Sequence, residues 1–318
     1  MPWKPVDTVK IIKRPLTRAH NKFLDEAAEI QLDRASAKDA AFLARQFIQA
    51  TLPHRDPKAS TWTRKNGNFA LGLQAGFNHL TGETYGLPYG VIPRLLLFWI
   101  TTEALRTKHR RLELGDSLAQ FMREVGLSPD TGGGKRSDAK RLQEQMRRLF
   151  QAHISFMQDV QEQGASGEAW LDMKIAPRGI LWWDVKNPEQ GTLWKSWIEL
   201  GESFFEAITS SPIPVDTRAL KALKRSPLAL DLYALCCYES YRAGKNDKAR
   251  FIPWRALMTQ LGAEYQGERA AHDFAVKCRK ALRKVQQVMP SLRLGNESGG
   301  IIILPSSTTA IPQQTSSE

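Results

Sequence analysis

The sequence predicts a mainly helical α+β protein with two tandem winged-helix (winged helix-turn-helix) domains behind an N-terminal helical arm. Three observations support this prediction: a pattern that recurs after 136 residues, a strongly basic helix in each copy, and turn-punctuated strands after each basic helix. A chain of 318 residues is long enough for two ordinary domains. We expect an arm over 1–60, a first domain over 61–209, a second domain over 210–306 and a disordered tail over 307–318.

The N-terminal arm is basic and contains two predicted helices. The first covers residues 22–34 and the second residues 37–52. Proline cannot continue a helix, so Pro53 ends the pattern. The apolar stripe of the second helix consists of Phe42, Phe47 and Ile48.

The first domain is predicted to open with a hairpin, because Asn66-Gly67 stands between two β-prone stretches. A helix follows from Pro93 to Arg106, and its apolar residues lie on almost every side, which indicates burial. Residues 150–208 carry strand-like stretches between turns, and we interpret them as wing strands. Residues 210–216, which include two prolines, are the predicted linker to the second domain.

The internal repeat appears when the sequence is shifted by 136 positions. The segment 121–126 then aligns with 257–262, and each is a short helix that stops at a glycine. We expect Gly126 and Gly262 to adopt the left-handed conformation of helix C-caps. Each copy has a long apolar helix, a short strand, a short helix, a basic helix and strands, which is the order of a winged helix-turn-helix. Because the identity is low, a chance match between two helical segments stays open.

The basic helices are the candidate DNA-binding elements. In each helix the apolar residues fall in one arc and the basic residues in the opposite one. A basic face is usually only solvated, but two such faces at equivalent repeat positions favour a nucleic-acid partner. The candidates in the first copy are Arg136, Lys140, Arg141, Arg147 and Arg148. Those in the second copy are Arg269, Lys277, Arg279, Lys280, Arg283 and Lys284, with Arg293 in the wing hairpin.

The roles within the second helix follow from side-chain chemistry. Arginine bonds base edges in a bidentate way, so Arg279 and Arg283 are predicted to read bases. The candidates for phosphate contacts are Lys277, Lys280 and Lys284. Arg293 is expected to reach the adjacent minor groove.

The composition points to a polyanionic partner. Lys and Arg outnumber Asp and Glu by 45 to 33, which gives a formal net charge of +12. The longest apolar run, Leu95 to Ile100, is far shorter than the ~20 residues that span a bilayer. The N-terminus lacks the pattern of a signal peptide, so we expect a cytoplasmic protein with no membrane partner. The three cysteines have no zinc-site spacing and are expected to be buried thiols.

Signatures of an enzyme are weak in this sequence. The glycine-rich stretch 129–137 departs from a phosphate-binding loop at its first glycine and after its lysine. The six histidines are scattered, without the paired spacing of a metal-dependent nicking site. We therefore expect no catalytic residues, no metal site and no cofactor.

Four segments carry a resemblance to a known family. The chain resembles plasmid-encoded replication initiators of the RepA type from about Thr61 to Pro305. It departs from them at Cys236-Cys237, which we assign to core packing. The segments are Gly86 to Gly90, Pro93 to Thr107, Leu114 to Met122 and Ser226 to Tyr233.

The resemblance implies a function that composition does not show. Proteins of this type bind repeated sequences in double-stranded origin DNA, open adjacent AT-rich DNA, and recruit the host replicative helicase and the host initiator. The resemblance also implies a homodimer that represses its own promoter. Two alternatives stay open: a DNA-binding transcriptional repressor without initiation activity, and an enzyme that acts on DNA.

Overall fold

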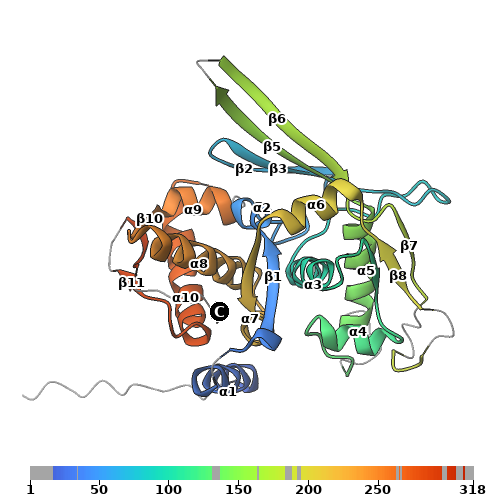
Figure 1. Cartoon of the computed structure of the whole chain (residues 1–318), viewed down its shortest axis with the longest axis horizontal. Coiled ribbons are helices and arrows are strands. Elements are labelled where there is room, and N and C mark those ends of the chain that lie inside the picture. The colour runs from blue at the N-terminus through green and yellow to red at the C-terminus, as the bar shows by residue number, and fades with distance from the viewer. Residues whose placement is uncertain are drawn as a thin grey trace, which may run out of the picture.

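The structure is a computed structural model of the 318-residue chain, and it divides into two units on either side of a central strand (Figure 1). Within the described residues it has ten α-helices, which lie around several small antiparallel sheets. The α+β class predicted from the sequence is therefore confirmed. The described residues are 17–33, 35–130, 137–162, 165–182, 188–191, 195–262, 265, 267–295, 299–305 and 311.

The first unit begins with the long helix α3, whose apolar residues on nearly all sides are buried as predicted. A three-stranded sheet of order β4-β8-β7 closes this unit. Its elements are α3 (Val91–Thr107), β4 (Arg111–Glu113), α4 (Leu118–Glu124), α5 (Asp138–Gln151), β7 (Arg178–Ile180) and β8 (Trp197–Glu199).

The second unit repeats this order of elements and also ends in a three-stranded sheet, β10-β12-β11. Adding 136 to the bounds of α3 gives 227–243, which lies within α8. The same shift places α4 on α9 and α5 on α10, so the order and spacing of the helices agree with the predicted repeat. The elements are α8 (Pro227–Asn246), β10 (Arg250–Pro253), α9 (Trp254–Leu261), α10 (Ala270–Val288), β11 (Leu294–Gly295) and β12 (Gly300–Ile303).

A long hairpin interrupts the first unit between its basic helix and its closing strands. This hairpin, β5–β6, joins the earlier hairpin β2–β3 in a four-stranded sheet of order β2-β3-β5-β6. It projects from the body of the molecule in Figure 1. The turn predicted at Asn66-Gly67 is confirmed, with Asn66 opposite Phe69 and Gly67 at a φ of 61°. The four strands are β2 (Thr61–Asn66), β3 (Phe69–Gln74), β5 (His153–Glu162) and β6 (Ala165–Lys174).

The strands predicted over residues 150–208 therefore belong to two sheets. Only β7 and β8 join β4 to close the first unit. The C-terminal part of that range is wrong as a strand prediction, because α6 (Glu202–Ser210) is a helix that buries Phe204 and Ile208.

The segment 37–52, predicted as one helix, instead forms three short elements, one of them a strand. It contains a short 3-10 turn (Ala37–Asp39), β1 (Ala40–Ala44) and the short helix α2 (Arg45–Gln49). The predicted linker is also a strand, β9 (Pro212–Asp216), which pairs antiparallel with β1. This long-range pairing overrides local helix propensity over 40–44.

Two prolines fit β9 because only one of its edges is paired. The N–H of Asp216, in phase with Pro212 and Pro214, points away from β1 and donates to the Tyr233 hydroxyl at 2.8 Å. An N–H at either proline would likewise point away from β1. The prolines therefore remove no hydrogen bond between β1 and β9. The chain continues from β9 into α7 (Thr217–Leu223), and α1 (Arg18–Leu32) packs against α7 and α10.

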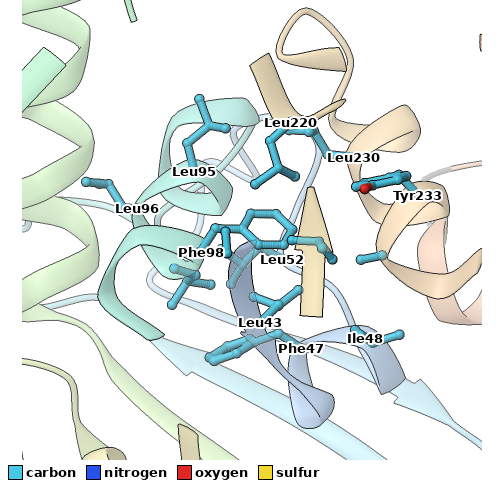
Figure 2. Close-up of a cluster of buried hydrophobic side chains, with 14 of the residues drawn as sticks. Leu43, Phe47, Ile48, Leu52, Leu95, Leu96, Phe98, Leu220, Leu230 and Tyr233 are labelled. Atoms are coloured by element: carbon cyan, nitrogen blue, oxygen red, sulfur yellow. The ribbon is translucent and has the colours of Figure 1, made fainter. Parts of the chain in front are cut away.

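One apolar core extends through both units. Side chains from β1, α2, α3, α7 and α8 meet around the β1–β9 pair (Figure 2). They include Leu43 and Phe47 from the arm, Phe98 from the first unit and Leu230 from the second. This shared core fixes the relative position of the units. All three cysteines are free and buried, as predicted.

The two glycines that end the short helices differ. Gly126 has a φ of 80°, so its predicted left-handed cap is confirmed. Gly262 has a φ of −142°, and the same prediction is wrong there. A Cβ at Gly262 would lie 2.3 Å from a ring carbon of Phe274. Close packing against α10 therefore accounts for glycine at this position.

Candidate nucleic-acid interface

Helix α10 has a buried apolar face and an exposed basic face. Phe274, Cys278, Leu282 and Val285 are buried, which agrees with the face predicted from the sequence. Lys284 is half-buried. The exposed basic residues are Arg269, Lys277, Arg279, Lys280 and Arg283.

Aromatic rings hold three of these basic side chains in place. The Lys277 ammonium lies 4.8 Å from the centroid of Tyr265, and the Arg279 guanidinium lies 4.9 Å from the centroid of Trp254. Lys284 lies 5.6 Å from the ring of Phe23 in α1. Such contacts restrict long side chains while their charged ends stay near the surface.

Helix α5 carries a smaller set of exposed cations. Lys140 and Arg147 are exposed, and Arg141 is exposed with one bond to Asp138 at 3.0 Å. Arg136 lies outside the described residues.

Arg148, by contrast, is engaged inside the protein. Its side chain is only 15% exposed and forms ion pairs with Asp56 at 3.3 Å and Glu144 at 2.7 Å. The guanidinium also donates to the carbonyl of Leu87 and lies over the ring of Tyr89. These contacts hold the loop before α3 against α5, and they offset the charge of Arg148.

The two basic helices border connected hollows at the N-terminal ends of α3 and α8. A cleft of about 870 Å³ lies between α10 and the start of α8, and it includes Lys280 and Arg55. A hollow of about 570 Å³ joins Lys284 of α10 to Arg141 of α5. A third, of about 300 Å³, brings Arg141 together with Arg225. We call these hollows together the central basic groove, and its basic lining residues are Lys22, Arg55, Arg141, Lys221, Lys224, Arg225, Lys277, Lys280 and Lys284. The acidic residues Glu26, Asp138, Glu144 and Asp273 line it as well.

Five of these cations were missed by the sequence analysis: Lys22, Arg55, Lys221, Lys224 and Arg225. One signal was present, because the pair Lys224-Arg225 stands directly before the helix start at Ser226-Pro227. Burial, together with the charge of Lys22, lowers the pKa of Lys224. The Lys224 ammonium donates to the carbonyl of Gly126 at 2.7 Å, which ties the second unit to the first.

A buried ion pair lies beneath the central basic groove. Arg94 of α3 binds Asp231 of α8 with two bonds of 2.7 and 2.8 Å. The same guanidinium donates to the carbonyls of Leu52, Pro53 and Gly90. All three side-chain nitrogens of Arg94 are thus occupied, and the N-terminal ends of α3 and α8 are held together.

His54 completes this cluster. Its Nε2 lies 2.8 Å from Asp231 Oδ2. Burial lowers the pKa of His54, although the bond to Asp231 acts in the opposite direction. Burial would raise the pKa of Asp231, but Arg94 and His54 outweigh it and hold that pKa well below its usual range. Asp231 is therefore ionised and balances Arg94.

The wing of the second unit is only partly described. Arg293 is exposed, and its guanidinium donates to the carbonyl of Pro290 at 2.5 Å. The tip at 296–298 lies outside the described residues, so the expected minor-groove contact of Arg293 stays a prediction.

Two other features are absent from the part of the chain that the structure describes. No group of three or more His, Cys, Asp or Glu side chains with the arrangement of a metal site occurs in them. Among the helices within that part of the chain, none has the length and apolar character needed to cross a bilayer.

Comparison with known proteins gives one family match and two structural matches. The family model for plasmid-encoded RepA protein matches residues 87–256, from the loop before α3 into α9. A crystal structure of domains 2 and 3 of RctB has a TM-score of 0.50 and 13% identity, covering 81% of this chain and 94% of that chain. A second structure of these domains has the same identity and coverage with a TM-score of 0.45. No curated protein matches the chain.

Proposed function

The chain belongs to the plasmid-encoded RepA family, whose model matches more than half of its length, and we propose that it initiates plasmid replication by binding repeated double-stranded sites at the origin. Each unit is proposed to act as a winged helix, with α5 and α10 as recognition helices. The mechanism relies on binding energy and DNA bending, and no covalent step is assigned to any residue.

The convergence of α5 and α10 on the central basic groove carries this proposal. Arg141 of α5 and Lys284 of α10 line the same hollow, so cations from both repeats face one region. A duplex lying across this face meets α5 in one major groove and α10 in the next. Successive major grooves are about 10 base pairs apart, so the predicted site covers about 20 base pairs.

The central basic groove then faces the phosphates between the two major grooves. Arg55 and Arg225 come from loops, and Lys280 comes from α10, so the positive charge is not confined to the helices. We assign these side chains to phosphate contacts, which position the protein without reading sequence. Arg279 and Arg283 keep their assignment to bases. Arg148 is assigned a positioning role, because its charge is already paired with Asp56 and Glu144.

A pair of matched variants tests the DNA-binding step. Lys277→Ala/Lys280→Ala removes two cations of the groove, whereas Lys245→Ala/Lys248→Ala removes two exposed lysines at the other end of α8. A helix of 20 residues is about 30 Å long, so the control pair lies far from the groove. We expect the groove variant to lose affinity for origin DNA and the control variant to keep it. Equal loss in both would place the DNA elsewhere.

Initiation is distinguished from repression by a replication assay. An initiator supports a plasmid that carries only its own origin, opens the adjacent AT-rich DNA, and recruits the host helicase and host initiator. A repressor binds its operator but does not maintain such a plasmid. The expected result is maintenance with the wild-type chain and loss with Lys277→Ala/Lys280→Ala. Binding without maintenance by the wild-type chain would favour the repressor, and a homodimer on the promoter would fit that second role.

A further inference from the structure

An apolar groove lies at the junction of the two units, apart from the basic one. It has a volume of about 910 Å³ and shares only Lys221 with the three hollows described above. Its walls come from α3, β1, β9 and α7. The apolar lining includes Phe42, Leu95, Phe98, Trp99 and Leu220.

Ile311 lies in this groove. It is 8% exposed, although it belongs to the polar segment beyond β12. Among residues 306–318, it is the one large apolar residue in a sequence otherwise made of Ser, Thr, Gln, Ala, Pro and Glu. Of the residues in this tail, the apolar side chain is the one whose removal from water is most favourable in free energy. Ile311 is the one described residue of the predicted disordered tail, 307–318.

We propose that the apolar groove is a docking site for the C-terminal segment of this same chain, with Ile311 as its anchor. The groove walls come from α3 of the first unit, from the β1–β9 pair and from α7, so the docked side chain contacts the junction from outside the shared core. Only seven residues separate Ile311 from the end of β12 at Ile303. Such a short connection gives a high effective concentration, which lets a single anchoring side chain suffice in cis.

The contact is tested directly by methyl NMR on the full chain. Isoleucine δ1 methyl groups are labelled, and Ile311 is identified by the signal that disappears in Ile311→Val. If Ile311 is docked, its methyl gives nuclear Overhauser effects to ring protons of Phe42 or Trp99, both of which line the groove. A random-coil shift without such effects would overturn the proposal.

The contribution to the junction is tested by thermal unfolding. Ile311→Asp is expected to lower Tm by about 2 °C, because it removes the burial of one aliphatic side chain. Leu80→Asp is the matched control, since Leu80 is 96% exposed and should tolerate the same charge. Equal Tm values for Ile311→Asp and the wild type would overturn the role of the anchor, even if the chain binds DNA normally.

Discussion

The Arg94–Asp231 pair is predicted to be the strongest single link between the two units. Asp231→Ala leaves the guanidinium of Arg94 buried without its counter-charge. Removing one partner of a buried ion pair costs about 3–5 kcal/mol. Arg94 keeps its bonds to the carbonyls of Leu52, Pro53 and Gly90, so we expect the lower end, about 3 kcal/mol.

This loss is measurable as a shift in Tm. The entropy of unfolding is about 2.1 cal/mol/K per residue, or about 0.7 kcal/mol/K for 318 residues. Asp231→Ala should therefore lower Tm by about 4–5 °C in calorimetry. Glu113→Ala, which breaks the exposed pair with Lys195, should shift Tm by 1 °C or so at most.

A double variant removes both charges of the ion pair together with the bonds that Arg94 donates to carbonyls. Arg94→Met/Asp231→Leu leaves no buried charge, but the carbonyls of Leu52, Pro53 and Gly90 lose their donor, so it should stay less stable than the wild type. The reasoning would be refuted if Asp231→Ala were as stable as Glu113→Ala. It would also be refuted if the double variant were as stable as the wild type.

Three further predictions concern pH, salt and the two adjacent arginines of α5. The pKa of His54 is below 6.5 in the folded chain, so as the pH falls below 6.5 the unfolded chain takes up a proton that the folded chain does not. The free energy of unfolding should therefore decrease in this range, and His54→Gln should flatten its dependence on pH. Each change of Lys277, Lys280 or Lys284 to Ala should reduce the log–log salt slope of DNA binding by about one, and an unchanged slope would remove that lysine from the phosphate contacts. Arg147→Ala should weaken DNA binding with a stability change of about 0.5 kcal/mol or less. Arg148→Ala should instead cost about 2–3 kcal/mol of stability, and the reverse pattern would contradict the roles given to these residues.

Local patterns predicted the helices and the repeat well. The apolar character of residues 93–106 gave α3, and the two-sided pattern of residues 269–285 gave α10. The hairpin at Asn66-Gly67 also followed from local turn chemistry. Each of these features depends on residues that are near one another in the sequence.

The features that sequence reasoning missed depend on distant segments. Strand β1 pairs with β9, more than 160 residues away, and neither segment has a pattern that names its partner. The helical wheel placed Arg148 among exposed cations, but it could not show that Asp56 and Tyr89 cover that side of α5. Arg55 lies in one loop and Arg225 follows Lys224 in another, and only the fold brings them together at the central basic groove.

A hydroxyl-radical footprint on origin DNA at fixed salt tests the central claim most directly. The wild-type chain should protect about 20 base pairs, with two strongly protected regions about 10 base pairs apart on one face of the duplex. Arg279→Ala/Arg283→Ala should lose protection in one half, and Lys140→Ala/Arg147→Ala in the other. If both variants lost the same half, or if Lys140→Ala/Arg147→Ala gave the wild-type footprint, the two basic helices would not share one DNA site.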